Sequence, residues 1–110
     1  HQGASWAEGS QKWLGRKWTG SEEELKKMRD EFDQAQKWAK EQKRPLYLGE
    51  FGAYEKADME SRVRWTSAIV REAEARGWSW AYWEFGAGFG AYDREKNEWR
   101  QDILNALIKR

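Results

Sequence analysis

Apolar positions recur along the chain in two alternating spacings. Residues 21–44 and 58–76 carry apolar side chains every three or four positions, as in a helix with one buried face. Residues 46–51 and 78–85 are short apolar or aromatic runs beside glycine, which is typical of strands. A last helical spacing covers residues 96–109. The order helix, strand, helix, strand, helix predicts an α/β fold with a parallel sheet.

The ends of these elements carry local signals. Ser21 opens the first helix with a capping box, because Glu24 follows three residues later. Asp58 caps the second helix, with Ser61 as the alternative, and Gly77 supplies a left-handed residue at its end. The segment 86–97 predicts a glycine-rich loop. The expected buried stripes are Leu25, Met28, Phe32, Ala35 and Ala39 in the first helix and Met59, Val63, Thr66, Val70 and Ala73 in the second.

Two strands are too few for the sheet that this order predicts. Both runs are apolar on both faces, as strands covered on two sides must be. A two-stranded parallel sheet would leave open edges and an uncovered face. We therefore expect residues 1–110 to form one segment of a larger sheet, whose other strands come from another chain, a second copy or a missing N-terminal region.

Composition limits the function classes. The chain has 110 residues, 39% hydrophobic and 35% charged, with net charge +1, which gives no field to attract nucleic acid or an anionic membrane. We expect no transmembrane helix, and no signal peptide is visible at the start. Cysteine is absent, which leaves the compartment open, and a single His excludes any site that needs two imidazoles. We expect no metal and no cofactor.

Aromatic residues are unusually frequent, with nine Trp, four Tyr and four Phe. Flat aromatic faces stack on sugar rings, although packing in the core is the alternative for about half of the tryptophans. Residues 1–20 have no sustained period and carry His1 and Trp6, and aromatic residues in a loop are better placed for a ligand than those on helices. Trp38, Trp65 and Trp99 lie in predicted helices, where packing is the default.

Glu50 is the first candidate for chemistry. It ends an apolar strand between two glycines, and active sites of parallel α/β folds lie beyond the carboxyl ends of the strands. The alternative is a structural carboxylate paired with an arginine such as Arg16 or Arg62.

The second strand ends in two further candidates, Trp83 and Glu84. Alternation places Trp83 with Ser79 and Ala81 on one side and Glu84 on the other. A tryptophan above small residues suits a platform for a sugar, with core packing as the alternative. Glu84 is a candidate for substrate contact, although a structural hydrogen bond suits it better than a catalytic role.

Several strings in this chain closely resemble glycoside hydrolase family 5 endoglucanases of the thermophilic endo-β-1,4-glucanase type. They are RPLYLGEFGAY, ADMESRVRWT, RGWSWAYWEF and GFGAYD, in the family's order and spacing. The resemblance implies a (β/α)₈ TIM-barrel segment from the C-terminal third. It places His1 just beyond strand 6, with helix 6 at 21–44, strand 7 at 46–50, helix 7 at 58–76, strand 8 at 78–84 and helix 8 at 96–109.

The same resemblance implies roles for site residues. Glu50 corresponds to the catalytic nucleophile, Trp83 to a sugar-stacking residue, and His1 and Trp6 to substrate-contacting residues. The family's acid/base glutamate follows strand 4 in an Asn-Glu pair, which this chain does not reach. We therefore expect a segment of a retaining β-1,4-glucanase that needs the N-terminal barrel part and is inactive alone. An extracellular parent enzyme fits this resemblance, and glucan or mannan preference stays open.

Two alternatives belong to other function classes. The tryptophan faces could hold glucan without chemistry, as a binding module. The open edges of the sheet could instead drive self-association, as a folding or assembly fragment.

Overall fold

The computed structural model describes residues 1–108, and this part of the chain contains three α-helices, a parallel pair of strands and a short hairpin. The predicted alternation of helices and strands is confirmed. In chain order the elements are η1 (Ser10–Trp13), α1 (Glu22–Gln42), β1 (Tyr47–Phe51), α2 (Met59–Ala75), β2 (Ser79–Tyr82), β3 (Tyr92–Asp93), β4 (Glu98–Trp99) and α3 (Gln101–Ile108).

The predicted helix caps are present. The Ser21 hydroxyl accepts the Glu24 N–H at 3.2 Å, and the Glu24 carboxylate accepts the Ser21 N–H at 3.0 Å, which completes the capping box. Asp58 rather than Ser61 caps α2, because its carboxylate accepts the Ser61 N–H at 2.9 Å. Gly77 follows α2 with φ of 71°, a left-handed conformation that glycine adopts without strain.

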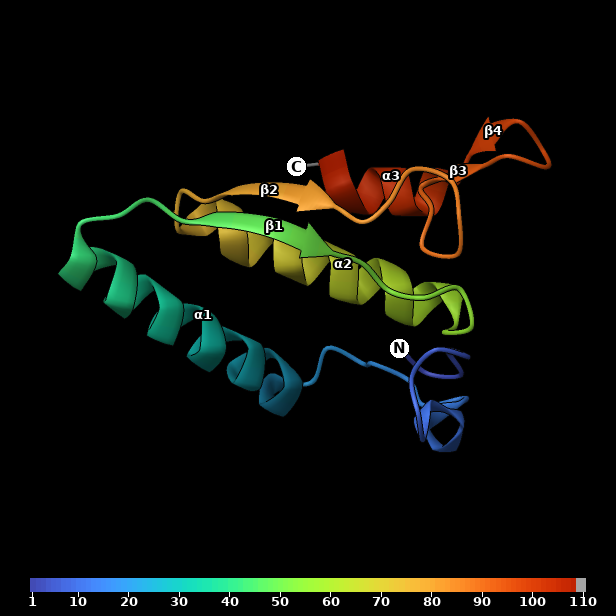
Figure 1. The fold of residues 1–110 in the computed structure, drawn as a ribbon, viewed down its shortest axis with the longest axis horizontal. Coiled ribbons are helices and arrows are strands. Elements are labelled where there is room, and N and C mark those ends of the chain that lie inside the picture. Colours follow the sequence, from blue (N-terminus) through green and yellow to red (C-terminus); the bar gives the residue numbers. More distant parts are fainter. Residues whose placement is uncertain (109–110) are drawn as a thin grey trace.

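The elements form a wedge of two layers (Figure 1). β1 and β2 pair in parallel, and α2 runs along one face of this sheet. α1 lies beside α2 on the β1 side, and α3 lies beside α2 on the β2 side. No other described element covers the opposite face of the sheet. The radius of gyration is 14.9 Å, above the roughly 13 Å typical of a compact domain of this length.

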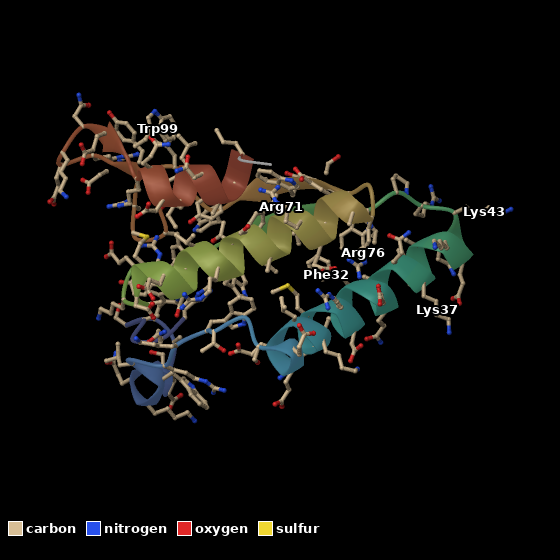
Figure 2. The ribbon with its side chains drawn as sticks, turned by 180° about the vertical axis from the view of Figure 1, so that it is seen from behind. Phe32, Lys37, Lys43, Arg71, Arg76 and Trp99 are labelled. Atoms are coloured by element: carbon tan, nitrogen blue, oxygen red, sulfur yellow. The ribbon has the colours of Figure 1, made fainter. Side chains whose placement is uncertain are left out.

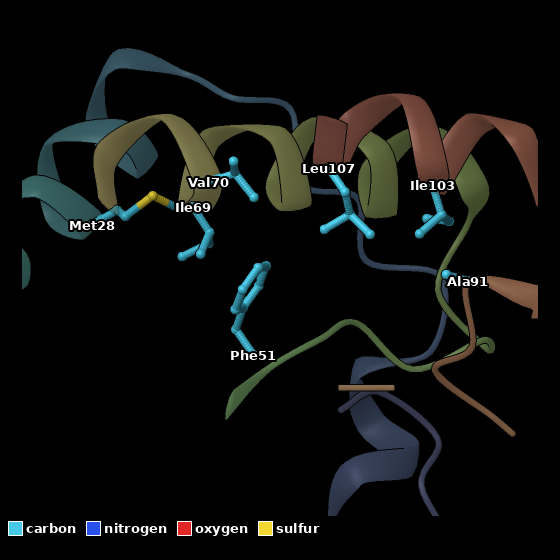
Figure 3. Packing of buried hydrophobic residues seen from close by; sticks show 7 residues of the cluster. All are labelled: Met28, Phe51, Ile69, Val70, Ala91, Ile103 and Leu107. Atoms are coloured by element: carbon cyan, nitrogen blue, oxygen red, sulfur yellow. The ribbon is translucent and has the colours of Figure 1, made fainter. Parts of the chain in front are cut away.

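The core lies between α2, α3 and the covered face of the sheet (Figure 3). Thr66, Val70 and Ala73 of the stripe predicted in α2 are fully buried. Ile103 of α3 is also fully buried and lies on the same side as Val70. The buried cluster comprises Met28, Phe51, Ile69, Val70, Ala91, Ile103 and Leu107.

β1 is buried on one face only, as expected for a two-stranded parallel sheet, which leaves one face uncovered. Tyr47 is 64% exposed and Glu50 is exposed, while Phe51 is buried. The reason is the single helical layer. The strand sequences are apolar on both faces, but the helices of residues 1–108 cover only one face of the sheet.

The C-terminal region differs from its prediction over residues 86–99. A β3–β4 hairpin occupies part of the expected loop, and α3 begins at Gln101 instead of residue 96. The Asp93 carboxylate accepts two backbone N–H groups of the hairpin turn, and Asn97 has φ of 55°. These local bonds compete with a helix. The expected helix end at Lys109 lies outside the described residues.

The three tryptophans that were predicted to lie in helices do not share one environment. Trp65 packs against the core near Phe51, with ring centroids 6.4 Å apart, as predicted. Trp38 is 54% exposed on α1, so its predicted packing role is wrong. Trp99 is on β4, not on a helix, and its half-exposed ring meets Tyr92 edge-on at 5.3 Å.

Charged side chains also join α1 to α2. Arg76 donates to Glu72 at 2.7 Å and to Asp33 of α1, and Arg29 of α1 donates to the other Glu72 oxygen at 2.8 Å. The Arg76 guanidinium lies 5.5 Å from the Phe32 ring centroid (Figure 2). Burial raises the pKa of Glu72, but the hydrogen bonds from Arg76 and Arg29 outweigh it and hold the pKa below its ordinary value.

This network predicts an acid-sensitive contact between α1 and α2. Because the pKa of Glu72 is depressed in the folded state, its contribution is present above the unfolded pKa of about 4.3 and is lost as pH falls further. Glu72→Gln should lower the unfolding free energy by about 2 kcal/mol at pH 7, and by much less at pH 3. Urea unfolding at both pH values measures this, with the exposed Glu41→Gln as control. An equal loss at both pH values would contradict the assignment.

Candidate functional site

The last two residues of β1, Glu50 and Phe51, lie in opposite environments, the first exposed and the second buried. The pairing register with β2 shifts between Leu48 and Phe51, so both residues pack against the core while Glu50 between them is exposed. A bulge of this kind re-aims a side chain at the end of a strand. The Glu50 side chain is thereby left at the surface.

The end of β2 lies directly against the end of β1. The Trp83 N–H donates to the Phe51 carbonyl oxygen at 2.7 Å, which extends the parallel pairing by one bond. A side chain on Gly52 would overlap the Trp83 carbonyl group, so only glycine permits this approach. Trp80 and Tyr82 pack on the core, whereas Trp83 is 49% exposed, in agreement with the predicted alternation. The peptide bond between Trp83 and Glu84 is cis.

The N-terminal loop folds back beneath the carboxyl end of β1 (Figure 1). The Lys56 ammonium donates to the Gly3 carbonyl oxygen at 3.0 Å. Trp6 meets the Tyr54 ring edge-on with centroids 4.7 Å apart, and His1 meets the Phe89 ring edge-on at 4.9 Å. The loop is thus attached to the segments that follow both strands.

These segments enclose a cleft of about 1000 Å³. Four of the five predicted site residues line it, namely Glu50, Trp83, His1 and Trp6. The cleft is rich in aromatic rings, which suits a sugar ligand. The other lining residues are Gln2, Trp13, Arg16, Lys17, Trp18, Glu24, Lys27, Phe51, Gly52, Ala53, Tyr54, Ala57, Ser61, Arg62, Trp65, Ile69 and Phe89.

Glu84, the fifth predicted residue, is not among the residues that line this cleft. Its carboxylate accepts the backbone N–H groups of Gly86, Ala87 and Phe89 at 3.2, 2.7 and 3.3 Å. These bonds shape the loop that carries Phe89, which corresponds to the structural alternative considered for this residue. Contact between Glu84 and a sugar stays a prediction.

The Glu50 carboxylate has no hydrogen bond or ion pair with any group of residues 1–108. The arginines that were its candidate partners are engaged elsewhere. Arg62 donates to the carbonyl oxygens of Ala53 and Phe89, and the Arg16 guanidinium lies over the Trp13 ring at 5.2 Å. The Glu50 carboxylate is therefore available to a ligand in the cleft.

A second carboxylate, that of Glu24, also lines the cleft, and one of its oxygens accepts three hydrogen bonds. Glu24 accepts the N–H groups of Ser21 and Thr19 and the Thr19 hydroxyl within 3.0 Å. The Ser21 N–H contributes most to lowering the pKa of Glu24, which keeps this group ionised. Glu24 is thus unsuited to donate a proton.

One wall of the cleft is aromatic and is formed by Tyr54, Phe89, His1 and Trp6. The sequence did not predict Tyr54 or Phe89 as site residues, and it offered Arg62 only as a possible partner of Glu50. The rings of Tyr54 and Phe89 lie 5.3 Å apart between the centroids and contact His1 and Trp6. The glycines on either side of Phe89 were a signal, because they marked a loop directly after a strand.

Residues 1–108 show neither a cluster of metal ligands nor a membrane-spanning helix. No three or more His, Cys, Asp or Glu side chains of this part gather as metal ligands would. None of its helices combines the length and the apolar character needed to span a membrane.

Comparison with known families identifies relatives of the chain. The family model described as Cellulase, glycosyl hydrolase family 5, matches residues 2–88. Endoglucanase H of Acetivibrio thermocellus is 34% identical over 104 residues, which is 88% of this chain and 11% of that protein.

Solved structures give closer matches. Cel5A of Thermotoga maritima, solved in complex with cellobiose, is 59% identical with a TM-score of 0.95 over 98% of this chain and 35% of its own. The same enzyme has been solved with mannotriose. The cellulose synthase subunit Z of Clostridioides difficile is 38% identical, with a TM-score of 0.92 over 98% of this chain and 36% of its own. The chain therefore spans about a third of these structures.

Proposed function

Because the chain belongs to glycoside hydrolase family 5, the cellulase family, we propose that it contributes the nucleophile and sugar-stacking aromatics of a retaining endo-β-1,4-glucanase. Members of this family are (β/α)₈ barrels, and the proposed segment comprises strands 7 and 8 with helices 6 to 8. The observation that carries the proposal is the shared cleft, in which an unpaired Glu50 carboxylate and the half-exposed Trp83 face the same space.

The chemistry assigns one role to each carboxyl group. Glu50 attacks the anomeric carbon while an acid protonates the leaving oxygen, so the glycosidic bond breaks and a glycosyl ester forms. The conjugate base of that acid then takes a proton from water, which attacks the same carbon and releases Glu50. Trp83, with His1 and Trp6, holds the sugar rings during both steps.

The acid must come from outside this chain. Retaining glycosidases hold their two carboxyl groups about 5–5.5 Å apart. Glu24 is engaged in the helix cap, and Glu84 is engaged by the loop that it shapes. The isolated chain is accordingly inactive, and the remaining barrel part supplies the acid/base.

Complementation tests this proposal. The chain is mixed with the part of Thermotoga maritima Cel5A that it does not cover, and reducing ends released from soluble β-glucan and glucomannan are measured. We expect cleavage by the mixture and none by either part alone. A stable complex without cleavage would contradict the proposal.

A non-catalytic glucan-binding role is the second candidate, favoured by the aromatic lining that the described chain already provides. Under this candidate, cello-oligosaccharides bind to the isolated chain in isothermal titration. Trp83→Ala should weaken that binding at least about tenfold, because it removes a stacking surface. Trp38→Ala is the matched control, since Trp38 is equally exposed but lies on α1 outside the cleft. Equal affinities for both variants would contradict the role of Trp83.

A further inference from the structure

Arg62 is a buried cation in the first turn of α2 that the proposed chemistry does not use. Its side chain is only 3% exposed, and it forms no ion pair with a carboxylate of residues 1–108. Removing a guanidinium from water is costly unless its N–H groups are satisfied. The partners that satisfy it are therefore informative about what this residue does.

The two partners are backbone carbonyl groups in the segments that follow the two strands. Nε of Arg62 donates to the Ala53 oxygen at 3.1 Å, just after β1, and Nη2 donates to the Phe89 oxygen at 3.3 Å, after β2. The Tyr82 hydroxyl donates to the same Phe89 oxygen at 2.6 Å. One guanidinium thus bridges the segments that follow Glu50 and Trp83.

These two segments carry one wall of the cleft. Tyr54 follows Ala53 directly, and its ring centroid lies 5.3 Å from that of Phe89. The Trp6 ring contacts the Tyr54 ring edge-on, and the His1 ring contacts the Phe89 ring edge-on. The Glu55 N–H donates to the Gly88 oxygen at 2.7 Å, so a direct backbone bond also joins the two segments. The bridge and this backbone bond together join the two segments that carry Tyr54 and Phe89, and the rings of Trp6 and His1 contact these two residues.

We infer that Arg62 is a positioning residue for substrate binding, which aligns the aromatic wall by tying the segments after β1 and β2 together. This inference rests on the proposed function. A planar guanidinium can serve both carbonyl groups at once with different N–H groups in a fixed geometry, whereas a lysine ammonium acts as a single point charge on a flexible stem. Arg62→Lys therefore retains the charge and removes the bridge.

The first experiment uses the isolated chain and measures hydrogen exchange of the Glu55 amide, which reports the contact between the two segments. We expect Arg62→Lys and Arg62→Met to accelerate this exchange about tenfold or more relative to helix amides. Tyr82→Phe removes the hydroxyl that donates to the Phe89 oxygen and also interacts with the Arg62 guanidinium. It should accelerate the exchange to a smaller extent, which keeps the test valid if the Arg62 variants fail to fold. Arg76→Met is the matched control, because Arg76 is also largely buried but lies between α1 and α2. Unchanged Glu55 exchange in Arg62→Lys or, should the Arg62 variants not fold, in Tyr82→Phe would overturn the inference.

The second experiment uses the complemented enzyme and separates KM from kcat. Displacement of the aromatic wall should raise KM about tenfold while kcat changes less than about twofold. A purely structural arginine would lower the active fraction and leave KM unchanged, as expected for Arg76→Met. An unaltered KM in folded Arg62→Lys would overturn the inference. If the complemented wild-type enzyme is inactive, the proposed function fails, whereas the exchange measurement still decides the role of Arg62.

Discussion

Glu50→Gln is expected to reduce glucan cleavage by the complemented enzyme about 10³-fold or more. The amide keeps the size of the carboxylate but cannot attack the anomeric carbon. The substitution should affect folding little, because the Glu50 side chain is exposed and its carboxylate has no hydrogen bond to residues 1–108. Initial rates on soluble β-glucan, at enzyme concentrations corrected for complex formation, provide the measurement. Glu31→Gln, at an exposed position of α1, should leave the rate unchanged.

Glu50→Ala with added azide distinguishes a nucleophile from an acid. Loss of the carboxylate leaves room for azide on the same side of the sugar, and its single displacement gives a glycosyl azide of inverted configuration. A product of retained configuration would assign Glu50 the acid role instead. Activity that survives both substitutions would remove Glu50 from the mechanism.

Gly52→Ala should be the most destabilising single substitution at the cleft. Its methyl group would overlap the Trp83 carbonyl group, so the ends of β1 and β2 would have to separate. Separation would break the bond between the Trp83 N–H and the Phe51 oxygen and would expose Phe51. We expect a loss of about 3 kcal/mol, which corresponds to a decrease in Tm of about 10 °C or more.

Gly49→Ala is the matched control in the same strand. A methyl group there would meet only the Tyr47 ring at ordinary contact distance, so the Tm should change little. Thermal unfolding followed by circular dichroism compares the two variants. Similar Tm values for both would show that the approach of Trp83 to Gly52 is not tight in solution.

Signals that act within one turn of the chain were readable from the sequence. Ser21 and Asp58 each cap a helix through a bond to the residue three positions later, and Gly77 needs only its own conformation. The hairpin over residues 92–99 was missed because most of it fell in the expected glycine-rich loop, and because the spacing of Trp99 and Ile103 also fits a helix that begins at residue 96. Asp93 and Asn97 decide the outcome through local bonds that the spacing of apolar residues does not record.

The candidate site was predictable as far as it follows from the ends of parallel strands. Glu50 and Trp83 come together because neighbouring parallel strands end at the same edge of a sheet. The wall formed by Tyr54 and Phe89 depends on contacts between segments more than 30 positions apart in the sequence. Arg62 looks like an ordinary helix cation in the sequence, and only its burial against two carbonyl groups distinguishes it.

The wedge shape has a consequence for which molecule can close the sheet. Each flank ends in a helix, α1 beyond β1 and α3 beyond β2, so the described chain has three helices for two parallel strands. A parallel sheet accommodates one crossover helix above each pair of neighbouring strands. If β2 of one copy paired with β1 of a second copy, α3 of the first and α1 of the second would both lie above the new strand pair, which accommodates only one helix. A different molecule whose outermost strands carry no helix on that side could pair with both β1 and β2 without a clash between helices.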